Sequence, residues 1–293
     1  MASTQEIRRR IRSVRNVAQI TRAVQLVASS KMRRAQERVV GSRPYAEQLA
    51  KLLSRVAAQA DDLSSLPLMQ QRDVKRVLVV VMTPDRGLAG ALNSNINRRA
   101  GLLAQELRRD YNNPTLPITY VAVGRKGRDF LTRTRQVMLA EFTGLGDQPK
   151  QADVRAIART ITDAYISGEV DRALLVYPKY VSTVTQTPTV LQLLPAEPPE
   201  AVETEGAAPQ YILEPDAETI FAELLPRYVE TQIYQPLLET VASFYSAQML
   251  AMKNATDSAN DLLADLTLTY NKVRQSAITT QILEVVSGAN ALQ

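Results

Sequence analysis

The stretch RQSAITTQILEVVSGANAL, residues 274–292, carries only two formal charges, Arg274 and Glu284. It closes a long helical pattern, yet it lacks the charged face that a helix exposed to water usually has. A helix end that is apolar or hydroxyl-bearing all round is expected to be buried. It is either a core helix of this same chain, which is the commoner case, or the end of a shaft that other subunits enclose.

A second helical seam begins the chain. Its residues alternate in steps of four and three, a heptad pattern that lasts for more than four heptads: Ile7, Ile11, Val14, Ala18, Thr21, Gln25, Ala28, Met32, Ala35 and Val39. The pattern predicts a helix with a closely packed partner, and Gly41 and Pro44 predict a bend or a local break. Helical character resumes over residues 45–61.

The C-terminal part of the chain repeats the same spacing. From residue 217 the pattern is helical to near the end, with Pro226 and Pro236 expected to kink or interrupt it. The predicted seam consists of Leu262, Leu266, Thr269, Val273, Ser276, Thr280 and Leu283. Two such seams, one at each end of the chain, predict a long antiparallel coiled coil.

Between the two seams the pattern changes to α/β. Residues 76–83 form a continuous β-branched run, which is typical of a strand buried on both faces. Further strands are predicted at 118–123, 136–142, 173–177 and 185–194, and helices at 91–109, 126–132 and 152–166. The alternation predicts a Rossmann-like domain with a mainly parallel five-stranded sheet, its last two strands forming an antiparallel edge hairpin.

The predicted organisation therefore has four segments: an N-terminal coiled-coil helix (1–61), the α/β domain (74–194), a loop (195–216) and a C-terminal coiled-coil helix (217–293). The loop is rich in proline and acidic residues and contains no Lys or Arg. Such a composition does not form a packed core, so we expect an exposed loop.

Composition excludes several classes of function. The chain has 293 residues, a net charge of +5, and neither Cys nor His. It therefore lacks thiolate and imidazole nucleophiles, the commonest general base and the usual zinc ligands. No apolar run of about twenty residues is present, so we expect no membrane span. The N-terminus lacks the apolar core of a secretory signal.

Two glycine-bearing turns are candidate phosphate sites. DRGLAG at 85–90 lies between a predicted strand and a helix, but it has neither the GxGxxG nor the GxxxxGK[ST] spacing. GRKG at 124–127 opens a helix where an anion is physically reasonable, although a solvated turn is the commoner case. No pair of carboxylates has the context of acid–base catalysis, so we predict no catalytic residue, metal or cofactor.

The basic excess lies at the N-terminus. Residues 1–40 hold ten Arg or Lys and only two acidic residues, Glu6 and Glu37. Such an arm fits a nucleic acid, an acidic membrane or an acidic protein surface. Tyr45 is the first aromatic residue, so stacking on single-stranded nucleic acid is unsupported. A basic helix in a DNA groove stays open, but here the seam runs through the basic segment.

At both ends the sequence resembles one family. IRRRIRSVRNVAQITRAVQLVASSKMRRAQ (7–36) with SRPY (42–45), RDVKRVLVVVMTPDRGLAGALN (72–93) and YNKVRQSAITTQILEVVSGANAL (270–292) are similar to segments of ATP synthase gamma subunits. The resemblance runs in order over nearly the whole chain. The family usually has Glu where this chain has Gln281, and often Cys where it has Ala89.

The resemblance implies a non-catalytic rotor, the central stalk of an F-type ATP synthase. It implies a coiled coil inside a ring of alpha and beta subunits, and contacts with epsilon and the membrane c-ring. It implies a peripheral position at the cytoplasmic face of a bacterial plasma membrane. Two rival functions, a nucleotide-binding enzyme and a DNA-binding coiled-coil protein, are carried forward.

From exposure we expect two sets of contacts, and the resemblance implies a third. The inner collar of alpha and beta subunits is expected to meet Arg274, Gln275, Ile278, Thr279, Ile282, Glu284, Val285 and Val286. Acidic groups of the same ring are expected to meet Arg8, Arg9, Arg12 and Arg15, with a plain solvated face as the alternative. The membrane ring and epsilon are expected to meet Tyr211 and Glu214.

Overall fold

The computed structural model describes residues 4–60, 63, 65–197, 214 and 216–290. Two helices, α1 (Thr4–Ala57) and α5 (Ala217–Asn290), flank an α/β segment. The chain separates into two compact units: Met1–Ser29 with Gln248–Gln293, and Ser30–Ala247. Both long helices run through both units. The four-segment division made from the sequence follows secondary structure and stays a prediction.

The second unit is built on a five-stranded sheet in the order β3-β2-β1-β4-β5. The strands are β1 (Val77–Met82), β2 (Ile118–Val123), β3 (Met138–Phe142), β4 (Arg172–Tyr180) and β5 (Gln186–Leu194). β1 pairs in parallel with β2 and β4, β2 in parallel with β3, and β4 antiparallel with β5. The predicted mainly parallel sheet with an antiparallel edge hairpin is confirmed.

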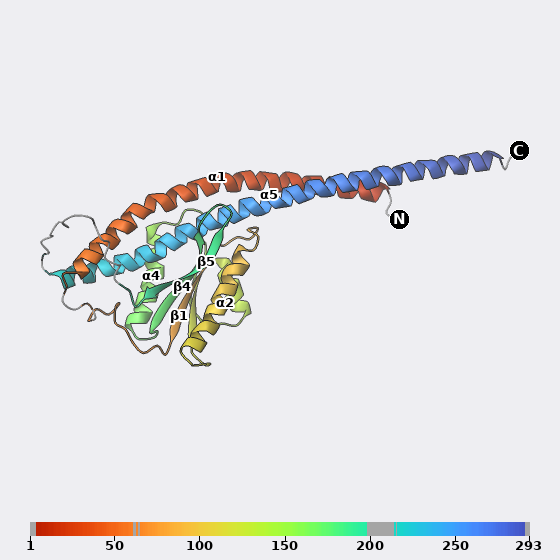
Figure 1. The fold of residues 1–293 in the computed structure, drawn as a ribbon. Coiled ribbons are helices and arrows are strands. Elements are labelled where there is room, and N and C mark those ends of the chain that lie inside the picture. The colour runs from red at the N-terminus through yellow and green to blue at the C-terminus, as the bar shows by residue number, and fades with distance from the viewer. Residues whose placement is uncertain (1–3, 61–62, 64, 198–213, 215, 291–293) are drawn as a thin grey trace. The chain divides into compact units, whose positions relative to one another are not determined.

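Both faces of the sheet are covered, which explains why β1 is buried along its whole length. α2 (Leu92–Asp110), α3 (Arg125–Arg133) and α4 (Gln151–Ile166) connect the strands, and α2 and α4 lie on opposite sides of the sheet (Figure 1). Because strand side chains alternate, Leu78, Val80 and Met82 share one face. They belong to a core with α4 and with parts of α1 and α5.

That core places the two long helices on the sheet. It includes Leu49, Leu53 and Val56 of α1, and it includes Phe221, Leu225, Val229, Ile233 and Leu237 of α5. The α5 positions repeat every four residues, the spacing of one helix face. In this unit the helices are therefore part of the domain core.

Of the two outcomes predicted at these prolines, a bend or an interruption, the interruption is wrong. Pro44 lies inside α1, and Pro226 and Pro236 lie inside α5, and neither helix is interrupted there. A proline inside a helix costs roughly 3 kcal/mol. Here buried neighbours on both sides of each proline, such as Leu225 and Val229, hold the helix in place and outweigh that cost.

In the first unit α1 and α5 pack antiparallel along a seam. The predicted α1 positions are correct: Ile7, Ala18, Thr21 and Ala28 are buried, and Ile11, Val14 and Gln25 are partly buried. The predicted α5 seam is partly wrong. Leu266 and Val273 lie in it, but Leu262 and Thr269 are exposed and Leu263 and Tyr270 take their places. Adjacent leucines at 262 and 263 allow either register, and packing on α1 selects Leu263.

Candidate functional site

Polar contacts fix the register of the helix pair in the first unit. The hydroxyl oxygens of Thr21 and Thr256 lie 2.7 Å apart in the buried seam. Near the start of α1, the Arg8 guanidinium donates to the Tyr270 hydroxyl at 2.6 Å and lies 5.5 Å from the centre of its ring. Arg8 is thus engaged within its own chain. This contact within the chain is neither the partner surface nor the solvated face that the sequence predicts for Arg8.

Beyond Val273 the described part of α5 has no cover. Every residue from 274 to 287, which we call the tip segment, is exposed. Its large apolar side chains are Ile278 (44% exposed), Ile282 (57%), Leu283 (61%), Val285 (72%) and Val286 (50%). Within the described residues, the tip segment is therefore not a core helix of this same chain. A continuous apolar segment of this kind is typical of an interaction site.

The other residues predicted at the tip, Arg274, Gln275, Thr279 and Glu284, are exposed as well. The Thr279 hydroxyl donates to the Gln275 carbonyl at 3.0 Å, and the Thr280 hydroxyl to the Ser276 carbonyl at 3.0 Å. The hydrogen-bond donors of these hydroxyl groups are therefore satisfied within their own helix. The segment presents mainly methyl groups to its surroundings.

The arginine arm is solvated in this chain. Arg9, Arg12 and Arg15 are exposed, and no ion pair joins them to another described residue. Arg10, in contrast, pairs with Glu6 at 3.0 Å. Arg8, Arg12 and Arg15 share a helix face by their spacing. Of the residues predicted to meet the membrane ring, Glu214 is exposed and Tyr211 lies outside the described residues.

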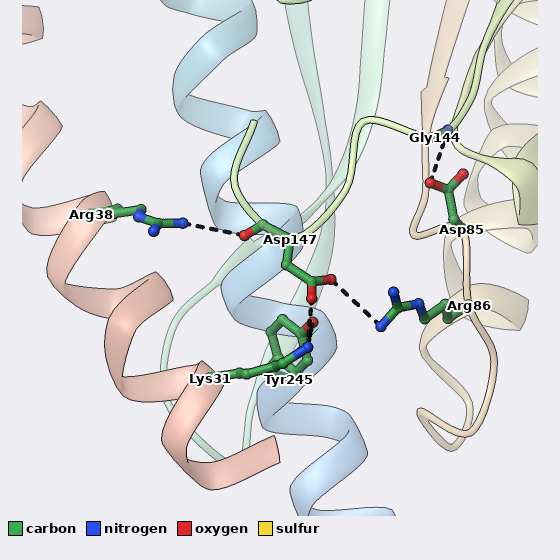
Figure 2. Close-up of polar contacts among 7 residues, drawn as sticks. All are labelled: Lys31, Arg38, Asp85, Arg86, Gly144, Asp147 and Tyr245. Carbon is green, nitrogen blue, oxygen red and sulfur yellow. Dashed lines mark hydrogen bonds and ion pairs between the residues drawn. The ribbon is translucent and has the colours of Figure 1, made fainter. Parts of the chain in front are cut away.

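The carboxyl edge of the sheet is occupied by the chain itself where a phosphate would bind in a Rossmann-type site. One Asp85 oxygen accepts the Arg125 N–H at the start of α3 (2.8 Å), and the other accepts the Gly144 N–H (3.0 Å; Figure 2). The next two N–H groups donate to the Pro84 carbonyl (3.3 Å) and to the Thr83 hydroxyl (2.7 Å). The helix start considered as an anion site is therefore neither open nor solvated. A carboxylate takes the place of the anion.

A cavity of about 260 Å³ opens beside this edge, lined by Asp85, Arg86, Arg125, Asp147 and Tyr245 among others. Both of its carboxylates are engaged within the chain: Asp147 pairs with Arg86 at 3.7 Å, and Asp85 accepts the two backbone N–H groups. Within the described residues no cluster of acidic side chains is arranged to hold a metal ion. In the same part of the chain no helix is long and apolar enough to cross a membrane.

Glu239 is the one acidic side chain of α5 that lies buried among the described residues. It accepts the Tyr180 backbone N–H at 3.1 Å. Burial raises the pKa of the Glu239 carboxyl, and the Tyr180 N–H and the charge of Lys179 oppose this only in part. The pKa of Glu239 is higher in the folded state than in the unfolded state. The carboxyl therefore contributes its full stabilisation below the unfolded-state pKa, and this stabilisation is lost as the pH rises through the folded-state pKa.

Glu239→Gln is expected to raise the free energy of unfolding at pH 8, because glutamine imitates the protonated form and its carbonyl can still accept the Tyr180 N–H. The gain is expected to disappear near pH 4, where the carboxyl is largely protonated in both states. Urea unfolding of the full chain at both pH values checks this. A loss of stability at pH 8 would contradict it.

Comparisons with known proteins agree with the terminal motifs. A family model described as ATP synthase matches residues 3–292. The ATP synthase gamma chain of Dehalococcoides mccartyi strain CBDB1 is 46% identical over 293 residues, with both chains covered completely. That of Roseiflexus castenholzii is 46% identical over 293 residues, covering 100% of this chain and 99% of the relative.

Solved structures share the fold. A chain of the Euglena gracilis mitochondrial ATP synthase superposes with a TM-score of 0.67 at 19% identity, covering 99% of this chain and 94% of that one. A chain of the Tetrahymena thermophila mitochondrial ATP synthase central stalk and c-ring gives 0.59 at 24% identity, covering 80% and 99%. The resemblance stated from the sequence is confirmed: this chain belongs to the ATP synthase gamma chain family.

Proposed function

We propose that this chain is the central-stalk rotor of an F-type ATP synthase and has no catalytic site of its own. It couples proton flow through a membrane c-ring to ATP synthesis or hydrolysis on beta subunits. The observation that carries the proposal is the exposed apolar tip segment (274–287), which ends a paired helical shaft. The gamma chain family membership supports it.

The mechanism is a difference in binding affinity. Each orientation of an asymmetric shaft favours one set of open and closed beta conformations over another. Rotation therefore changes nucleotide affinity at each site in turn. An apolar tip suits a rotating contact, because strong directional ion pairs would have to break at every step.

The proposed contacts with the alpha and beta ring follow from exposure, and those with epsilon and the c-ring follow from the family resemblance. The alpha and beta collar meets Arg274, Gln275, Ile278, Thr279, Ile282, Glu284, Val285 and Val286, and acidic groups of that ring meet Arg8, Arg9, Arg12 and Arg15. Epsilon and the c-ring meet Tyr211 and Glu214, with the loop at 195–216 between the α/β domain and the C-terminal helix. We place the complex at the cytoplasmic face of a bacterial plasma membrane, where this chain is peripheral.

The proposal is tested by mixing the full chain with alpha and beta subunits of a bacterial ATP synthase. We expect one copy of the chain per three alpha and three beta subunits, and hydrolysis of ATP by the complex. Size-exclusion chromatography with mass measurement gives the stoichiometry. Absence of any complex under conditions in which a relative's gamma chain assembles would overturn the proposal.

The two rival functions, a nucleotide-binding enzyme and a DNA-binding protein, predict results that differ from those of a rotor. A nucleotide-binding enzyme would be stabilised thermally by ATP or NAD, whereas the Asp85 carboxylate at the start of α3 leads us to expect no shift. A DNA-binding protein would bind random duplex with a steep salt dependence and would ignore alpha and beta subunits.

Reversing two charges of the arm, Arg12→Glu with Arg15→Glu, is expected to weaken assembly about tenfold at low salt and less at high salt, because rim charges act through screened attraction. Both side chains are exposed, so the chain itself should stay folded. Arg155→Glu, at an exposed position on α4, is the matched control. Equal assembly at every ionic strength would favour the solvated-face alternative.

A further inference from the structure

One carboxylate joins both long helices to the sheet. Asp147 follows β3, and its Oδ2 lies 2.5 Å from Lys31 Nζ of α1. Its Oδ1 lies 3.7 Å from an Arg86 nitrogen in the loop after β1. The same Lys31 ammonium donates to the hydroxyl of Tyr245 on α5 at 3.4 Å. Figure 2 shows Lys31, Arg86 and Tyr245 converging on it from three elements.

Further contacts close this group, which we call the Asp147 cluster (Lys31, Arg38, Arg86, Asp147 and Tyr245). Arg38 donates to the Asp147 backbone carbonyl at 3.3 Å. The Lys31 ammonium lies 5.4 Å from the centre of the Tyr245 ring. The loop carrying Asp147 is itself anchored, because Asp85 accepts the Gly144 N–H. The cluster therefore connects a rigid sheet edge to both helices.

The cluster is partly shielded from water. The side chains of Lys31 and Asp147 are 35% and 31% exposed, whereas the Arg33–Glu37 pair of α1 is 83% and 66% exposed. Burial acts to raise the pKa of Asp147, but the hydrogen bonds from Lys31 and Tyr245 and the charge of Arg86 outweigh it and hold that pKa below its usual value. Asp147 is thus a carboxylate near neutral pH, and its ion pair with Lys31 is less screened than a surface pair.

A second set of contacts holds the helices at the end of β4. Besides the Tyr180 N–H bond to Glu239, the Tyr180 hydroxyl accepts from Gln36, and Ser243 donates to the Pro178 carbonyl at 2.9 Å. The helices also pack on each other through Ala35, Val39, Leu238 and Ala242. These apolar side chains allow the helices to approach closely, but their contacts are not directional.

Directional contacts that lie away from the helix axes add resistance to twisting beyond that of the apolar core that the helices share with the sheet. We propose that the Asp147 cluster is a torsional joint that locks the helix pair to the sheet, so that a twist applied to the α/β unit passes into the helices without slip. Asp147 acts as a positioning residue, with Lys31 as its main partner. This inference rests on the proposed rotor function.

The test uses complete ATP synthase in membrane vesicles with Asp147→Asn in this chain. We expect assembly and ATP hydrolysis near wild type, with protons pumped per ATP reduced about threefold, since the ion pairs of Asp147 with Lys31 and Arg86 are both lost. Asp147→Glu should restore most of the pumping. Asp129→Asn, which removes an ion pair with Arg128 on α3, is the matched control.

A double variant separates a joint from general damage. If Lys31 and Asp147 act through one contact, Lys31→Gln with Asp147→Asn should lose no more pumping than either change alone. Multiplied losses, or normal pumping by Asp147→Asn, would overturn the joint. If Asp147→Asn prevents assembly, failure of Asp147→Glu to restore a coupled complex would also overturn it. The rotor proposal fails separately, if the wild-type chain does not assemble.

Discussion

Gly124→Ala is expected to lower the free energy of unfolding of this chain by about 3 kcal/mol or more. Gly124 is the residue before α3 and has φ = 93°, a conformation that L side chains rarely adopt. A Cβ there would lie 1.8 Å from the Thr83 carbonyl oxygen and 2.7 Å from its carbon. Both are backbone atoms, so no side-chain rotation relieves the clash.

The clash cannot be relieved by moving the strands, because the same residues hold the sheet together. Thr83 donates to the Val123 carbonyl at 2.8 Å and Gly124 to the Phe142 carbonyl at 2.7 Å. Separating β1 from β2 would break the first of these bonds and move Asp85 away from α3. The expected outcome is an α/β unit that unfolds at lower denaturant concentration.

Gly41→Ala is the matched control. Gly41 is exposed inside α1, and a Cβ there would meet no atom within 4 Å. Because alanine is the better helix former, this change is expected to stabilise the chain by roughly 0.5–1 kcal/mol. Urea unfolding of the three proteins under one condition measures both. A loss below about 1 kcal/mol for Gly124→Ala would contradict the clash.

The sheet was predictable because its signal is local. Six β-branched or long apolar residues in succession at 77–82 describe a strand covered on both faces, and the turns after it restrict the connection to a parallel crossover. The α1 seam was predictable for the same reason, since heptad spacing can be recognised from residues that are close together in the sequence.

The predictions from sequence failed where contacts between distant residues determine the structure. Pro226 and Pro236 predict breaks locally, but the core around Phe221, Leu225 and Leu237 keeps the helix intact. The Asp147 cluster was missed because Lys31 and Asp147 are 116 residues apart, and nothing local to either marks the other as its partner. The unpaired tip segment, in contrast, was predicted, since a shortage of charge can be counted directly.

Ile282→Asp is expected to weaken binding of the chain to alpha and beta subunits by at least tenfold while leaving its own stability within about 0.5 kcal/mol. Ile282 is 57% exposed, so an aspartate there costs the isolated chain little. Inside a collar the substitution forgoes roughly 1.5–3 kcal/mol of apolar burial and adds a carboxylate that must lose its water.

Gln281→Glu is the matched control, because it adds the same charge one residue away, at a position where the family usually has Glu. It is expected to assemble and couple like the wild-type chain. The measurement is a titration of each full chain into alpha and beta subunits, with unfolding curves of the free chains beside it. If both variants bind equally weakly, added charge at the helix end and not the lost apolar contact is responsible. If Ile282→Asp assembles and couples normally, the tip segment is not seated among apolar groups, and the rotor proposal loses the observation on which it rests.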